Sequence, residues 1–290
     1  MPYSNKHSGF TLVEIIIVIS IMGIIGGLAS MIIGRSLDSY AALERRTDLQ
    51  TSIRLAVERI SRELRHALPQ SICVHDGANC VGSAENRFYF IPVRESGRYQ
   101  DRPGAYIAPP PIQRDRLPVS PQNDDRFDVL STDGTNRLNA VSGNWVVVYN
   151  LNNTDIYTAP SNIRNQINTI VQKDINNTGT TIDDIDQIRF AGNQSFANHS
   201  PTRRFHIIED DNVTLFYLDG SNLYRDTTSF ASPNTQTGAP GLLMENVQAC
   251  TFTYTPGSQQ RAGLLRIDIT VSKQGETIQV IHDAHVYNTP

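Results

Sequence analysis

One apolar segment near the N-terminus, Phe10–Gly34, limits the possible folds of this chain more than any other feature. It is 25 residues long, and its single formal charge is Glu14. About 20 apolar residues in a helix are enough to cross the ~30 Å hydrocarbon core of a bilayer. The polar leader Met1–Gly9 contains Lys6, which favours a cytoplasmic N-terminus. The segment therefore predicts a membrane-spanning helix, with most of the chain on the far side of the membrane.

An amphipathic pattern follows the apolar segment without a break. Apolar residues recur every three or four positions, as a helix with 3.6 residues per turn requires: Leu49, Ile53, Ala56, Ile60, Leu64 and Ala67. Charged residues fill many of the other positions, and among them Glu58 and Arg62 have the spacing of an i,i+4 ion pair. We expect this half of the helix to pack one face against a folded body.

Two prolines bound the predicted helix. No proline occurs between Pro2 and Pro69, and Pro69 disfavours helical geometry at the residue before it. We therefore predict one continuous helix with a membrane-spanning half at 10–34 and an amphipathic half at 35–68. The remainder, 69–290, is predicted to be one strand-rich globular region.

Glu14 is the residue of the apolar segment that most needs an explanation. A charged side chain at the centre of a bilayer costs roughly 2.5 to 3.5 kcal/mol, so such a residue is a candidate functional site. One alternative is a secretory signal peptide cleaved after Ala29, and another is a plain uncleaved anchor. An acid so early in the apolar core is atypical of a signal peptide, and a plain anchor leaves the cost of the acid unexplained.

The stretch Gly9–Ile25, "GFTLVEIIIVISIMGII", resembles the class III signal of type IV pilins and of the pseudopilins of type II secretion. The resemblance implies that a prepilin peptidase in the membrane cleaves the chain after Gly9 and removes the leader 1–9. It also implies that the same enzyme N-methylates Phe10, the new N-terminal residue. In this family the acid at the position of Glu14 is used in assembly.

Simple electrostatics gives Glu14 a partner in the cleaved chain. Cleavage creates an amine on Phe10, which is cationic at neutral pH because the ordinary pKa of an α-amino group is about 7.7 to 8.0. Glu14 lies about one helical turn away and can pair with this amine or with the amine of a neighbouring subunit. Buried charges persist chiefly when they are paired. We therefore expect Glu14 to act in assembly and not in catalysis.

The region after Pro69 is predicted to form antiparallel sheets. Its clearest strand candidates are rich in β-branched and aromatic residues: Arg87–Val93, Asn144–Leu151, Arg203–Ile208 and Val213–Leu218. Asp219-Gly220 and Gln274-Gly275 each separate two alternating segments and predict hairpins. Long loops are expected at 99–139 and 152–181. The predicted fold class is α+β and pilin-like, with the long helix packed on an antiparallel sheet domain.

The C-terminal segment Leu242–Pro290, together with Arg87–Tyr99, resembles the large minor pilins of MSHA (mannose-sensitive haemagglutinin) type IV pili and the related PilW-type pilins. It also resembles the J-type pseudopilins of type II secretion, which is the second hypothesis. The resemblance implies major and minor pilins and an inner-membrane assembly platform as partners. It implies a single pass of the inner membrane, a periplasmic domain, and later a place in a fibre. A third hypothesis is a signal-anchored periplasmic binding protein or enzyme.

The chain has three cysteines, and all of them follow the apolar segment. An oxidising compartment there permits a disulfide. Cys73 and Cys80 bracket the turn-prone sequence "VHDGAN" and are the preferred pair. A Cys80–Cys250 bond and free thiols are the alternatives. Cys250 alternates with Phe252 and Tyr254, which predicts a small core residue on one face of a strand.

No motif for catalysis, a cofactor or a metal stands out in the sequence. His282 and His285 are three residues apart and point to opposite faces of a strand, so they cannot chelate one ion. Asp183, Asp184 and Asp186 lack the spacing of a calcium loop and are expected to be solvated acids. The net charge is −4 and the basic residues are scattered, which argues against a nucleic-acid partner. We expect a protein that is not an enzyme and binds no cofactor.

Overall fold

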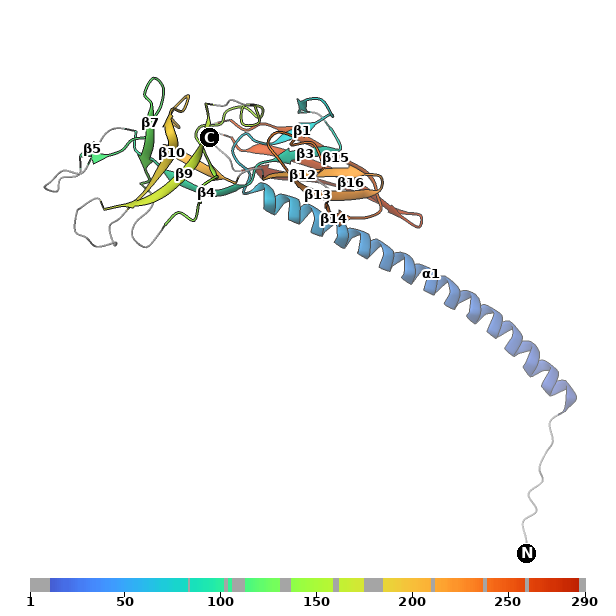
Figure 1. The fold of residues 1–290 in the computed structure, drawn as a ribbon. Coiled ribbons are helices and arrows are strands. Elements are labelled where there is room, and N and C mark those ends of the chain that lie inside the picture. The colour runs from blue at the N-terminus through green and yellow to red at the C-terminus, as the bar shows by residue number, and fades with distance from the viewer. Residues whose placement is uncertain are drawn as a thin grey trace, which may run out of the picture.

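One long helix projects from a body of antiparallel sheets (Figure 1). The computed structural model describes residues 11–82, 84–101, 104–105, 113–130, 137–158, 162–174, 185–209, 212–236, 239–258 and 261–286. The helix is α1 (Leu12–Leu64), and all pairings between the named strands are antiparallel. The α+β class predicted from the sequence is confirmed.

The strands form three larger sheets and one small hairpin. In order across the first six-stranded sheet they are β14 (Gly241–Met244), β13 (Asn222–Thr228), β12 (Val213–Asp219), β3 (Arg87–Phe90), β1 (Cys73–His75) and β2 (Cys80–Val81). The second six-stranded sheet contains β4 (Val93–Arg98), β11 (Arg204–Ile208), β8 (Trp145–Val147), β9 (Arg164–Lys173), β10 (Ile185–Gln194) and β7 (Asp124–Asp128). The three-stranded sheet contains β15 (Val247–Thr255), β16 (Gly263–Lys273) and β17 (Glu276–Val286). The hairpin pairs β5 (Gly104–Ala105) with β6 (Gln113–Arg114).

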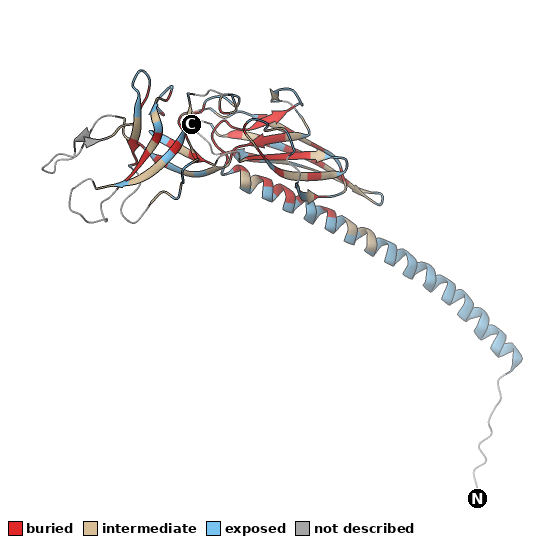
Figure 2. Cartoon of the chain, viewed as in Figure 1, coloured by how far each residue is buried: buried red, intermediate tan, exposed pale blue. Residues whose placement is uncertain are grey.

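The helix divides into an exposed half and a docked half (Figure 2). Every residue from Thr11 to Tyr40 is exposed. The buried residues of α1 all lie in its C-terminal part: Leu49, Ile53, Ala56, Val57, Ile60 and Leu64. The periodicity predicted for this half is confirmed, and Val57 adds to the buried stripe.

The helix ends at Leu64 and not at the predicted Leu68. The next residues leave the helix to pair with the chain that follows β3. Ala67 forms an isolated antiparallel bridge with Pro92, and the backbone N–H of Leu68 donates to the carbonyl of Ile91 at 2.8 Å. Tertiary backbone pairing therefore ends the helix before the restriction from Pro69 applies.

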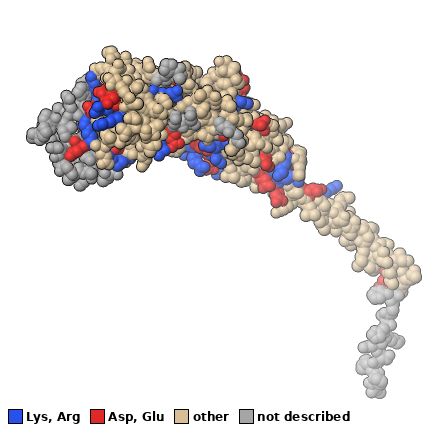
Figure 3. Space-filling model, in the orientation of Figure 1, with Lys and Arg blue, Asp and Glu red and all other residues tan. Residues whose placement is uncertain are grey.

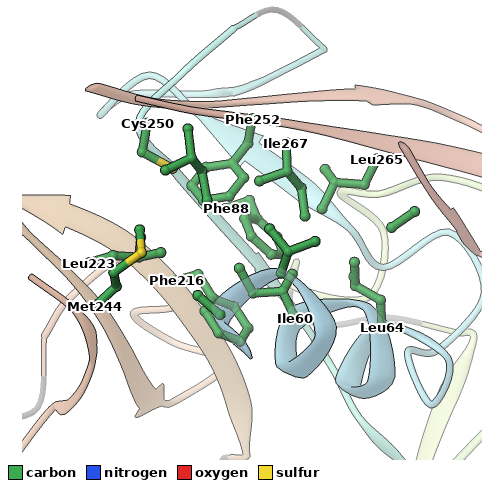
Figure 4. Close-up of a cluster of buried hydrophobic side chains, with 14 of the residues drawn as sticks. Ile60, Leu64, Phe88, Phe216, Leu223, Met244, Cys250, Phe252, Leu265 and Ile267 are labelled. Carbon is green, nitrogen blue, oxygen red and sulfur yellow. The ribbon is translucent and has the colours of Figure 1, made fainter. Parts of the chain in front are cut away.

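The first core lies where α1, the first six-stranded sheet and the three-stranded sheet meet. Figure 4 shows Ile60 pointing from the helix toward the aromatic side chains of this core and Leu64 pointing toward Leu265. The ring of Phe88 lies 5.1 Å from that of Phe216 and 4.6 Å from that of Phe252, measured between centroids. Helix and sheets thus share one continuous apolar cluster.

The opposite face of the first sheet is also buried. Alternate residues such as Tyr89 and Leu215 point away from the helix and pack in a second cluster with Val147 and Ile208 of the second sheet. This two-sided burial explains why the part of β12 from Leu215 to Leu218 is a continuous apolar run, since only a strand with one solvated face alternates. The second sheet also has a core of its own, built around Phe127, Phe190 and Phe205. We call the part of the chain from Val93 to Ile208, which carries this sheet, the distal lobe.

Two strands of the second six-stranded sheet lie where the sequence predicted loops. β7 falls within 99–139 and β9 within 152–181. Their buried positions include polar groups: Asp128 is fully buried and accepts hydrogen bonds from Lys173 Nζ at 2.9 Å and from Gln187 Nε2 at 2.8 Å. A buried carboxylate satisfied in this way is compatible with a sheet interior. Apolar alternation therefore fails to mark these strands.

Cys73 and Cys80 form a disulfide across the β1–β2 hairpin, with Cα atoms 5.2 Å apart. The turn between them is held by Asp76, whose Oδ1 accepts from the backbone N–H groups of Ala78 and Asn79 at 2.8 and 2.7 Å. Cys250 is a free, buried cysteine in the first core. Burial raises the pKa of the Cys250 thiol to about 12, so it stays protonated at ordinary pH.

Docking of α1 can be tested with two leucines of the same helix. Leu64 is 0% exposed and Leu55 is 63% exposed. We expect Leu64→Ala to lower the free energy of unfolding by about 2 to 5 kcal/mol through lost burial and a cavity. Leu55→Ala should change it by less than about 0.5 kcal/mol. Urea unfolding of the full chain in detergent, followed by circular dichroism, measures both, and equal effects would contradict the docked arrangement.

The cysteine assignment predicts a thiol count that depends on folding and reduction. A thiol-reactive reagent at pH 8 should label none of the three cysteines in the folded, unreduced chain, because two are bonded and Cys250 is buried. In urea it should label one, and in urea after reduction all three. Labelling of three thiols in urea without reductant would show that the Cys73–Cys80 bond is absent.

Candidate functional site

Thr11 is the N-cap residue of α1. Its backbone is extended, with φ −80° and ψ 149°, and its Oγ1 accepts from the backbone N–H of Glu14 at 3.3 Å. A threonine at the N-cap and a glutamate three residues later have the spacing of a capping box. Sequence reasoning overlooked Thr11, although the pattern Thr-x-x-Glu before an apolar run was there to indicate it.

The carboxylate of Glu14 lies at the positive end of the helix dipole. A negative charge in the first turn is favourable there. Glu14 is exposed, and among the described residues none forms an ion pair or a side-chain hydrogen bond with its carboxylate. Gly9 and Phe10, the predicted cleavage and methylation positions, lie outside the described residues. Thr11 thus caps the backbone N–H of Glu14, while the carboxylate of Glu14 is exposed.

The apolar half of α1 has no cover in the isolated chain. Within the described residues, α1 is the one helix long and apolar enough to cross a membrane, and its most apolar window is entirely exposed. Figure 3 shows that the charged side chains gather on the body and on the docked half of the helix. A contiguous apolar surface of this size is unfavourable in water and marks a surface that lipid or other proteins cover.

No contact within the described chain requires the glycines in the apolar half of α1. A Cβ built at Gly23, Gly26, Gly27 or Gly34 would meet no atom within 4 Å. The helix also continues through all four positions. Whatever these glycines provide therefore depends on neighbours of the helix.

Polar contacts fix the docked half of α1 on the body. Arg225 of β13 donates from Nε to both carboxylate oxygens of Glu63, at 3.1 and 2.8 Å, and Arg59 donates to Glu63 at 3.2 Å. The predicted ion pair between Glu58 and Arg62 is wrong, because neither residue takes part in any ion pair of the described residues. Glu63 lies toward β13 and pairs with Arg225 of that strand as well as with Arg59 of the helix.

The other candidates from the sequence remain separate from this site. His282 lies on the face of β17 that packs toward α1, where Ser61 Oγ and His282 Nε2 are 3.2 Å apart, and His285 is on the exposed face. Asp186 is buried and accepts from Arg137 Nη2 at 2.6 Å, so it is not a solvated acid as expected, and Asp183 and Asp184 lie outside the described residues. In the described ranges no three histidine, cysteine or acidic residues are grouped to hold a metal ion.

Comparison with known proteins identifies the N-terminal segment. Residues 4–30 match the family model of the prokaryotic N-terminal methylation motif. No match to a curated protein or to a solved structure was found. The match covers positions 4–9 of the leader, the predicted cleavage point and most of the apolar half of α1. The chain therefore has the N-terminal motif of type IV pilin-like, prepilin-type proteins, together with an apolar helix consistent with a membrane anchor.

Proposed function

We propose that this protein is a minor pilin that takes part in the assembly, priming or tip formation of a type IV pilus of the MSHA kind. The observation that carries the proposal is the division of α1: the part that matches the methylation motif is uncovered and apolar, while the part beyond it is built into the core. The tail Leu242–Pro290 adds support through its resemblance to the MSHA pilus biogenesis protein MshO.

In this proposal the protein acts by assembly and is not an enzyme. The prepilin peptidase removes residues 1–9 and methylates Phe10, which creates a cation about one turn from Glu14. Glu14 then pairs with this amine or with that of a neighbouring pilin, and the pairing lowers the cost of holding both charges in an apolar environment. The uncovered half of α1 leaves the inner membrane and packs among other pilin helices, and the body moves with it from the periplasm into the fibre.

The size of the body favours a minor subunit. The distal lobe adds a second six-stranded sheet with its own core beyond the sheets that dock α1. A subunit at the tip has no neighbour above it, so it can carry such an addition without blocking the next subunit. The same features support a second candidate, a J-type pseudopilin of type II secretion. Deletion of the gene would favour this candidate if secretion were lost while pili stayed intact.

The intact mass of the chain purified from membranes tests the family assignment. We expect a mass that corresponds to a chain beginning at N-methylated Phe10. Cells that lack the prepilin peptidase serve as the control and should yield the chain with Met1–Gly9 still attached. A chain that keeps its leader in normal cells, or one that begins at Ser30, would contradict the proposal and favour a signal-anchored or secreted protein.

The charge of Glu14 can be removed while the spacing of a capping box is kept. Glutamine also serves at the third position of a capping box, so Glu14→Gln keeps the cap and removes the charge. We expect this variant to be cleaved normally. Its incorporation into fibres should fall at least about tenfold, because the ion pair is lost. Immunoblots of sheared fibres measure the effect, with Glu44→Gln, an exposed acid of the same helix, as the matched control. Normal incorporation of Glu14→Gln would refute the pairing role.

A further inference from the structure

We propose that a groove between α1 and β17 binds an extended, acidic segment of a partner protein, which adds as a strand beside β17. This inference does not depend on the proposed function, because the groove belongs to the docked half of the helix. It requires only that the body be folded as described.

The groove is a hollow of about 680 Å³ along one side of the helix. Its apolar floor is formed by Ile53 and Val57 of α1 and by Val280 of β17. Ser61 and His282, in hydrogen-bond contact across the helix and the strand, also line it. No strand other than β17 contributes to the lining, so the groove lies along the edge of the three-stranded sheet.

The outer edge of β17 is suited to pairing with another strand. β17 is eleven residues long, and its one partner among the described strands is β16. In an antiparallel pair about half of the backbone N–H and C=O groups point away from the partner. Natural edge strands are usually protected by short length, charged side chains (especially lysine), proline or a bulge. Glu276–Val286 contains neither lysine nor proline, its register with β16 is unbroken, and Ile281 is 60% exposed. Its acids are Glu276 at one end and Asp283, which is paired with Arg266 of β16.

The helix side of the groove is basic and lacks internal partners. Arg54, Arg62 and Arg65 line it and are all exposed, and Glu58 is the only acid in the lining. None of the three arginines forms an ion pair or a side-chain hydrogen bond with a described residue. The strand edge would bind an extended backbone, and the arginines select carboxylates on it.

A partner protein fits this surface better than the membrane does. Arg54 follows Gly34, the end of the apolar segment, by 20 positions, or about 30 Å along a helix. Screening limits attraction to charged headgroups to roughly 8 Å at physiological salt. The arginines of the groove therefore lie beyond the reach of anionic lipid at the base of a helix that spans the bilayer.

Synthetic peptides test the proposal on the full chain in detergent. The probe is a fluorescent peptide of eleven residues, the length of β17, in which glutamate alternates with valine. One control replaces every glutamate with lysine, and a second carries N-methyl groups on four consecutive central residues, which blocks strand pairing on both edges. We expect the parent peptide to bind, as measured by fluorescence anisotropy, and both controls to bind at least about tenfold more weakly.

Charge reversal in the protein locates the site. Arg54→Glu and Arg62→Glu should each weaken binding of the parent peptide by on the order of tenfold. Arg46→Glu is the matched control, because Arg46 is exposed on the same helix but lies outside the groove, and it should have less than about a twofold effect. Unchanged circular dichroism verifies that each variant is folded.

Several results would overturn the proposal. Absence of binding, equal binding of the N-methylated peptide, or an equal effect of Arg46→Glu would each exclude strand addition at this groove. A dimer of the chain that Arg54→Glu dissociates, with no binding of the acidic peptide, would instead assign the groove to a second copy.

Discussion

Burial of the C-terminal half of α1 is the contact on which the rest of this structure depends. Ile60 and Leu64 are fully buried among aromatic residues from both the first sheet and the three-stranded sheet. Each large side chain buried in this way contributes about 1.5 to 3 kcal/mol. The ion pair between Glu63 and Arg225 then fixes the rotation of the helix about its axis. Because one half is held so firmly, the other half must project, and its apolar surface is available to other molecules.

Features set by local periodicity were predictable from the sequence. The stripe of α1 follows from a spacing of three and four residues, and the strands β16 and β17 follow from alternation around Gln274-Gly275. Features set by contacts distant in sequence were not predictable. Glu63 pairs with Arg225, which is 162 positions away. The i,i+4 spacing considers only residues of one helix and therefore predicted a pair between Glu58 and Arg62 instead. The end of α1 at Leu64 also depends on a distant segment, around Pro92.

The distal lobe shows most clearly where pattern reading ends. Its sheet places β8 between β11 and β9, an order that no local signal specifies. Asp128 is fully buried, yet a sequence pattern assigns an aspartate to the surface. At the N-terminus the opposite holds, because Thr11 and Glu14 form their capping contact within one turn. This contact was therefore predictable from the sequence, because the pattern Thr-x-x-Glu before an apolar run indicates it.

Under the proposed function, the dimensions of the body favour an end position in the fibre. Packed helices lie about 8 to 10 Å apart. Six strands at a spacing of about 4.8 Å span roughly 24 Å, and this body carries two such sheets and a three-stranded one. Bodies of this width cannot stand side by side at the spacing of their helices, so each further copy has to move along the fibre axis until its body clears the last. At the tip no copy lies above, and the distal lobe, which lies beyond the C-terminal end of α1 (Figure 1), needs no clearance there.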